Sequence, residues 1–252
     1  MTRDALSTTS DGRKIKDAVQ VVYGSKFRST EEDNMKSRSA GGGVSINRNG
    51  NNRCRRRRQH ALFTLIALAV GVAGAGIAGE TKVDVDENSF RCILEMTKVR
   101  HFYVDNVLGD LQSTVDIAQA GRGEYPAGSV VQLIPTEVMI KHEKGYSPVT
   151  RDWEFFSVDI SKDGSKIHSR GAAEVNNRLG LNCFACHVKA KPEFDFICEQ
   201  TNGCDPIPVT RPMFTALQRS DPRCKDAPEL TDEDKQALSD LAEVVKTLTQ
   251  KQ

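Results

Sequence analysis

Five consecutive residues form the clearest chemical motif in this sequence. Cys183, Phe184, Ala185, Cys186 and His187 give the pattern C-x-x-C-H, to which c-type haem is attached. Side chains three positions apart share one face of a helix, so two thiols at this spacing can reach the two vinyl groups of one porphyrin. The next residue, His187, is then held beneath the iron as its proximal ligand. The motif therefore predicts one covalently attached haem c, with its iron bound by His187.

Two other chemistries use a pair of cysteines at this spacing. A zinc site needs two further ligands, which Cys198 and Cys204 could supply, although their spacing is not that of a usual zinc knuckle. A thioredoxin-like dithiol follows a strand of a βαβ unit, and the sequence pattern contains no such unit. A structural zinc-binding domain thus remains an alternative to the haem.

The N-terminal region indicates export. Residues 1–60 contain 14 Lys/Arg against 6 Asp/Glu, a net charge of +8, whereas residues 61–252 carry a net charge of −7. Residues 1–59 are polar and basic, and we expect a disordered extension because they cannot bury a core. The uncharged apolar run at 60–79 follows a block of arginines, which is typical of a signal peptide or a signal anchor. Translation from Met35 would shorten the unusually long region before this run.

The composition is that of a globular chain. Over 252 residues, 38% are hydrophobic and 27% charged, which excludes collagen-like, coiled-coil and wholly disordered proteins. A single long apolar run excludes a polytopic membrane protein. Residues 80–252 suit one exported haem c domain, in the periplasm or another extracytoplasmic space. We expect its partner to be a redox protein or a small-molecule or gas ligand. Membrane contact is expected only through the N-terminal segment, and we expect no nucleic-acid partner.

An exported chain rich in loops is expected to contain disulfides. Four cysteines remain besides Cys54 and the haem motif: Cys92, Cys198, Cys204 and Cys224. We favour the short loop Cys198–Cys204 together with Cys92–Cys224, which would join the start of the domain to its end. Free buried thiols are the alternative.

The hydrophobic pattern predicts an α+β fold. Residues 91–120 have helical character, with apolar residues at helical spacing before Gly121. The β-like runs lie at residues 129–134, 138–141, 153–160 and 166–168, the last two joined in a hairpin by Asp163 and Gly164. Residues 191–228 are rich in Pro and Cys and predict loops. Thr231 and Asp234 predict the capped start of a C-terminal helix. We expect an antiparallel sheet with flanking helices around the haem.

These features resemble the cytochrome P-460 and cytochrome c′-beta family. The resemblance covers about residues 90–205 and rests on residues 125–131, residues 153–156 and the late C-x-x-C-H motif. Members of that family are periplasmic, with an antiparallel sheet and helices around one haem whose iron is five-coordinate. Some oxidise hydroxylamine or nitric oxide, and others only bind small gases. The resemblance implies His187 as the iron ligand, whereas the lysine that some members cross-link to the haem has only a loose counterpart, Lys141.

The group opposite His187 distinguishes two functions. A methionine there suits electron transfer, whereas an empty apolar face suits binding or chemistry of small molecules. Met213, in the loop segment, and Met139, in an apolar run, are the candidate distal ligands. Met96, His101, His142 and His168 are further candidates, of which the last two flank strands and are expected in solvent. An electron carrier and a five-coordinate protein that binds or oxidises nitric oxide or hydroxylamine both remain open. Any enzyme activity would rely on the iron itself.

Overall fold

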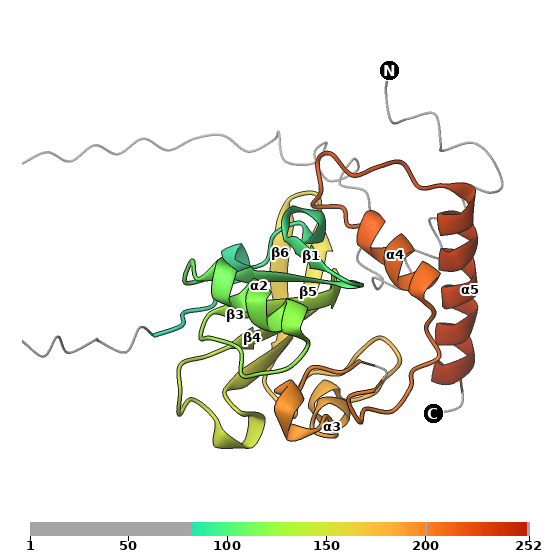
Figure 1. Ribbon diagram of the computed structural model, residues 1–252. Coiled ribbons are helices and arrows are strands. Elements are labelled where there is room, and N and C mark those ends of the chain that lie inside the picture. Colours follow the sequence, from blue (N-terminus) through green and yellow to red (C-terminus); the bar gives the residue numbers. More distant parts are fainter. Residues whose placement is uncertain (1–81, 200, 251–252) are drawn as a thin grey trace, which may run out of the picture. The chain divides into compact units, whose positions relative to one another are not determined.

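The computed structural model describes residues 82–199 and 201–250, whose central element is a six-stranded antiparallel sheet (Figure 1). The strands lie in chain order, so each pairs with its neighbour in the sequence. They are β1 Thr97–Val99, β2 Phe102–Asn106, β3 Ser129–Ile134, β4 Glu137–Lys141, β5 Trp153–Ser161 and β6 Gly164–Arg170. The expected strands and the final hairpin are confirmed. The N-terminal extension, the signal segment and Cys54 lie outside the described residues.

Four α-helices accompany the sheet in the described part of the chain. They are α2 Leu111–Ala120, α3 Cys183–His187, α4 Arg211–Arg219 and α5 Asp232–Thr249. Short 3-10 turns are η3 Glu87–Ser89, η4 Ile93–Glu95, η5 Pro148–Thr150 and η6 Pro192–Phe194. The α+β class, with an antiparallel sheet and flanking helices, is therefore as predicted. None of these helices has the length and apolar character needed to cross a membrane.

The long helix expected over residues 91–120 is wrong in its first half. Only Leu111–Ala120 is α-helical, and Gly121 ends this helix with a left-handed φ of 69°, as expected. Residues 97–106 instead form β1 and β2, joined by a tight turn in which Arg100 has a φ of 54°. The valines and aromatic residues of these two strands favour β-structure. The helical spacing of apolar residues corresponds to a real helix only after β2.

The proline-rich segment contains a helix that the sequence pattern did not predict. α4 begins after Thr210, and Pro212 occupies its first turn, where a missing N–H removes no helical hydrogen bond. α4 packs against α5 and against β3 (Figure 1). The C-terminal helix is confirmed as α5, where Thr231 and Asp234 form the expected capping box.

The sheet separates two apolar clusters. Trp153 and Phe155 of β5 face the cluster that also contains residues of α2 and contacts α3. Phe156 and Val158 alternate to the other face, where the segment that precedes β1 covers them. A third cluster lies between α4, α5 and the end of β3. The motif helix α3 therefore lies on the face of the sheet that carries Trp153 and Phe155.

Both expected disulfides are present. Cys92–Cys224 joins residues 132 positions apart and connects the chain before β1 to the segment between α4 and α5. Cys198–Cys204 closes a short loop after the motif helix. The favoured pairing is confirmed, and the alternative of four free thiols is excluded.

Candidate functional site

The whole C-x-x-C-H motif forms one helical turn, α3. Asn182 caps this turn, because its side-chain oxygen accepts a hydrogen bond from the Ala185 N–H at 2.9 Å. The amide nitrogen of Asn182 donates to the carbonyls of Ala172 and Val175, at 3.0 and 3.1 Å. A single turn is too short to be stable alone, so this side chain helps to fasten it to the preceding loop.

Cys183 and Cys186 are the two cysteines of the described residues that form no disulfide. Both are partly buried, and Cys183 packs against the apolar cluster on the sheet. Burial, with a smaller contribution from the Glu137 carboxylate, raises the pKa of Cys183 to about 12. A thiol with this pKa stays protonated at neutral pH, unlike the activated thiolate of a redox dithiol.

His187 is held in one tautomer. Its Nδ1 lies 2.6 Å from the carbonyl oxygen of Phe196, and because a carbonyl can only accept, Nδ1 carries the proton. Burial lowers the pKa of His187, so the ring is neutral at neutral pH and Nε2 keeps its lone pair. A neutral imidazole anchored through Nδ1–H is the form that binds a metal through Nε2.

Aromatic rings surround the motif. The ring of Phe155 lies edge-on to both His187 and Phe184, with centroid distances of 5.4 and 6.0 Å. Phe184 in turn contacts Phe196 at 5.9 Å. Such rings exclude water and lower the local polarity around an imidazole ligand.

An apolar cavity of about 70 Å³ is lined by Glu137, whose carboxylate is close enough to Cys183 to contribute to the raised pKa of that thiol. Its other walls are Leu133, Ile134, Asn177, Arg178, Leu179, Ile207, Val209, Phe214, Leu217, Leu241 and Val245. The Glu137 carboxylate accepts a hydrogen bond from the Arg178 N–H at 3.2 Å, and burial raises its pKa to about 7. The cavity has room for only a few atoms.

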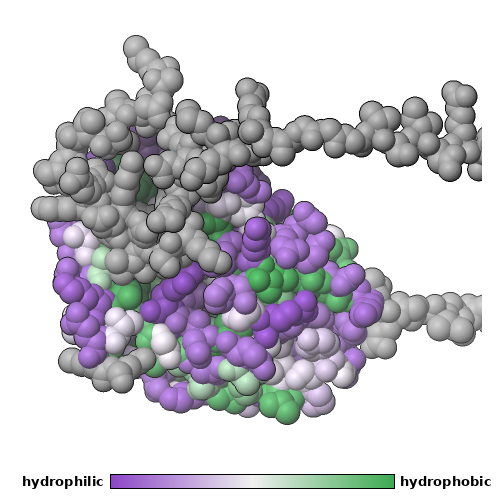
Figure 2. Space-filling view, turned by 180° about the vertical axis from the view of Figure 1, so that it is seen from behind, coloured by the Kyte–Doolittle hydropathy of each residue, from purple (hydrophilic) through white to green (hydrophobic). Residues whose placement is uncertain are grey.

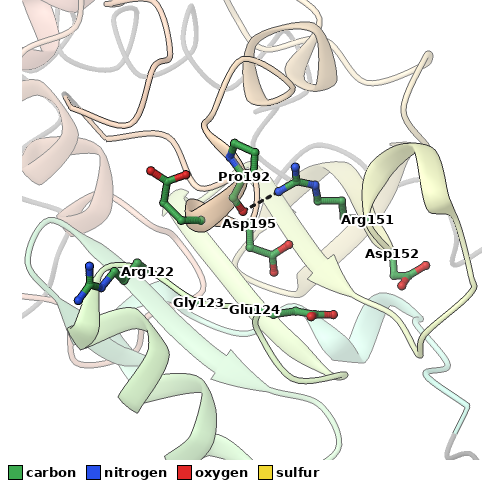
Figure 3. A pocket seen from close by; sticks show the side chains of 8 residues that line it. Arg122, Gly123, Glu124, Arg151, Asp152, Pro192 and Asp195 are labelled. Atoms are coloured by element: carbon green, nitrogen blue, oxygen red, sulfur yellow. Dashed lines mark hydrogen bonds between the residues drawn. The ribbon is translucent and has the colours of Figure 1, made fainter.

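A larger hollow of about 700 Å³ lies between residues 122–124, residues 151–152 and residues 192–195, and no motif residue lines it (Figure 3). Figure 3 shows Arg122, Arg151, Glu124 and Asp195 around it, so its lining mixes cations and carboxylates. Arg151 donates to the carbonyl of Pro192 at 2.8 Å across one side. Because neither cysteine nor histidine lines this hollow, its size does not make it the centre of the predicted chemistry.

The two candidate distal methionines lie in different clusters. Met139 pairs with Phe155 across β4 and β5 and belongs to the cluster that contacts Cys183. Met213 is buried between α4 and α5, and its sulfur accepts from the Thr210 N–H at 3.4 Å. The structure thus brings Met139, and not Met213, into the apolar cluster next to the motif.

The remaining distal candidates are dispersed. Met96 packs in the cluster on the opposite face of the sheet, and His168 is exposed as expected. The expectation that His142 is solvated is wrong. The ring is buried, and its Nε2 lies 2.8 Å from a Glu154 oxygen, which gives this buried nitrogen a hydrogen-bond partner. His101 has a buried Nδ1 with no hydrogen-bond partner among the described residues.

Lys141, the loose counterpart of a cross-linking lysine, forms a buried ion pair with Asp195. Its ammonium group lies 2.8 and 2.9 Å from the two Asp195 oxygens and donates to the Arg151 carbonyl at 2.7 Å. Its three donors are therefore used, and it is buried with Asp195. Sequence reasoning missed Asp195 and Phe196, because only the folded chain brings them to Lys141 and His187.

No protein-family model, curated protein or solved structure matches this chain. The chemistry of the site is therefore defined by its own donor groups. These groups are two unbridged thiols and one imidazole with an anchored Nδ1–H, presented together on one capped helical turn.

Proposed function

We propose that this protein is an exported mono-haem c-type cytochrome that acts in electron transfer or redox chemistry. One observation carries the proposal. His187 directly follows the unbridged C-x-x-C pair, and its Nδ1–H donates a hydrogen bond to the Phe196 carbonyl. Cys183 and Cys186 would hold the porphyrin by thioether bonds, and His187 would bind the iron through Nε2. The bound haem would supply one-electron chemistry, and the protein would orient it and exclude water.

The cysteine pairing favours haem over zinc. A zinc site at the motif needs Cys198 and Cys204, and these are consumed in a disulfide. In residues 82–199 and 201–250, the one group of three or more metal-binding side chains is Cys92, Asp221 and Cys224, whose cysteines are also bridged. Two disulfides are also compatible with the export on which haem attachment depends.

The position of Met213 favours a second function at the same haem. This methionine best fits the sequence pattern of a small electron carrier, yet its sulfur caps α4 within the α4–α5 cluster. An iron without a distal methionine has an open coordination position. The alternative is therefore a five-coordinate haem protein that binds or oxidises small nitrogen compounds, as in the cytochrome P-460 and cytochrome c′-beta family that the sequence resembles.

The proposal is tested by producing the full chain in a host that attaches c-type haem. We expect one haem for each chain, still bound after denaturation because it is covalent. The double variant Cys183→Ala/Cys186→Ala should lose this haem, whereas the matched double variant Cys198→Ala/Cys204→Ala, which removes only a disulfide, should keep it. A colourless protein that contains zinc would overturn the proposal.

The two functions are separated by adding carbon monoxide or nitric oxide to the reduced protein. Rapid binding, with a shift of the main absorption band, indicates an open iron site. A protein that resists both ligands has a distal side chain on the iron, and Met139→Leu should then restore binding if Met139 is that ligand. The variant Met213→Leu provides the comparison from the other cluster.

A further inference from the structure

We infer that the buried Lys141–Asp195 ion pair positions His187 through the carbonyl group of Phe196. The inference rests on the proposed function, because it concerns the residue that would bind the haem iron. Among the described residues, no hydrogen bond, ion pair or cation–π contact joins Lys141 or Asp195 to residues 183–187, so they are positioning residues. Their effect passes through the backbone of the segment that follows η6.

The ion pair fixes Asp195 from two sides. Lys141 donates to both carboxylate oxygens, and the Tyr125 N–H donates to Oδ2 at 2.9 Å. Both charged side chains are almost fully buried, at 3% and 5% exposure. A buried carboxylate that loses its cation is costly, so the pair opposes any movement of Asp195 away from β4.

The backbone that the pair holds is strained. Asp195 has a φ of 45° and Phe196 a φ of 65°, two successive left-handed residues that are not glycine. This conformation is unfavourable for residues other than glycine, so it persists only where other contacts impose it. The direction of the Phe196 carbonyl is set by this conformation, and that carbonyl accepts from His187 Nδ1. Release of Asp195 would let the segment relax and would turn the carbonyl away.

A second segment is tied to the same lysine. Lys141 donates to the carbonyl of Arg151, whose guanidinium group lies 4.8 Å from the Phe196 ring centroid. The same guanidinium donates to the carbonyl of Pro192, as the dashed line in Figure 3 shows. Lys141 therefore holds the side chain of Asp195 directly and the ring of Phe196 indirectly.

The expected consequence is a change in reduction potential of a definite sign. A hydrogen bond from Nδ1–H makes the imidazole a stronger donor and stabilises the oxidised iron. Loss of the Phe196 acceptor should therefore raise the potential. Removal of the Lys141 charge alone would have the opposite effect, because a nearby cation favours the reduced iron.

The test compares the reduction potential of the haem-loaded full chain with that of two variants. Lys141→Met loses a cation as well as the Phe196 acceptor, so its potential should lie below that of the double variant Lys141→Met/Asp195→Leu, whose charge changes cancel. Lys141→Met/Asp195→Leu should raise the potential above that of the wild type, because its charge changes cancel and only the loss of the Phe196 acceptor remains. Apolar replacement of both partners helps this variant to fold. The matched controls are Arg223→Met and Arg223→Met/Asp221→Leu, which remove another buried ion pair and should leave the potential unchanged. An unchanged or lower potential in the double variant would overturn the inference.

A haem-free readout separates this inference from the proposed function. If the purified full chain contains no haem, the proposed function fails, and the same variants are compared by nuclear magnetic resonance of the His187 ring. The Nδ1 proton of the wild type should exchange slowly with water, because it is hydrogen-bonded. Loss of this protection in the Lys141 and Asp195 variants supports positioning, and retained protection overturns it.

Discussion

At the scale of single residues, the tautomer of His187 sets what the motif can do. Because Nδ1–H is bound to a backbone carbonyl, only Nε2 is available to a metal. The variant His187→Ala should keep the porphyrin through Cys183 and Cys186 but lose the axial nitrogen ligand entirely. Its absorption spectrum should therefore differ from that of the wild type, and added imidazole should restore it in part. His168→Ala, which changes an exposed histidine, is the control. An unchanged spectrum in His187→Ala contradicts the axial assignment.

Glu137 gives the site a pH dependence that stability measurements can detect. Burial raises its pKa from 4.5 to about 7. Between these two pH values the folded protein therefore keeps a proton on Glu137 that the unfolded chain has released. This proton stabilises the fold fully below about pH 4.5, and the contribution, up to about 3 kcal/mol, is lost as the pH rises to 7. The variant Glu137→Gln should match the wild type in urea unfolding at pH 4 and be more stable at pH 8. Equal stability at pH 8 contradicts the assignment.

Whether a residue of the site could be predicted depends on how far along the chain its partners lie. Cys183, Cys186 and His187 could be found from the sequence because their spacing alone carries the chemistry. Lys141 and Asp195 could not be paired from the sequence, because they lie 54 positions apart and neither belongs to a motif. A left-handed φ at a residue such as Asp195 also leaves no mark in the sequence, because it is imposed by contacts made only after folding.

At the scale of elements, strands were easier to predict than short helices. β3, β4 and β5 are rich in valine, isoleucine and aromatic residues, which favour strands wherever they pack. α4 has only nine residues in a segment full of prolines, and its stability comes from its apolar face against α5. A helix of this kind depends on tertiary packing, and local sequence preference cannot reveal it.

The two disulfides should differ in their contribution to stability. In the loop-entropy model, Cys92–Cys224, whose cysteines are 132 positions apart, stabilises by about 5 kcal/mol, and Cys198–Cys204 by about 2 kcal/mol. Replacement of each pair by alanine, followed by urea unfolding, measures the difference. Cys92→Ala/Cys224→Ala should lose more, because it also leaves two gaps in a buried region. A larger loss in Cys198→Ala/Cys204→Ala would contradict this order.

At the scale of the whole molecule, the charge is divided along the chain. The acidic part, residues 61–252, carries a net charge of −7 and contains every described residue. The coloured part of the face drawn in Figure 2 is mainly hydrophilic around smaller hydrophobic patches. A net negative charge would steer this part of the chain towards basic partners by long-range attraction.

Electron exchange with small reagents tests this steering without knowledge of the partner. The rate at which a cationic oxidant takes electrons from the reduced haem protein should fall several-fold between about 10 and 500 mM salt, because screening weakens the attraction. The rate with an anionic oxidant should rise over the same range, because screening weakens repulsion. A neutral oxidant is the control and should respond little. If the cationic and anionic oxidants show the reverse dependence, the haem is reached through a locally basic surface, and the net charge of the domain does not direct its encounters.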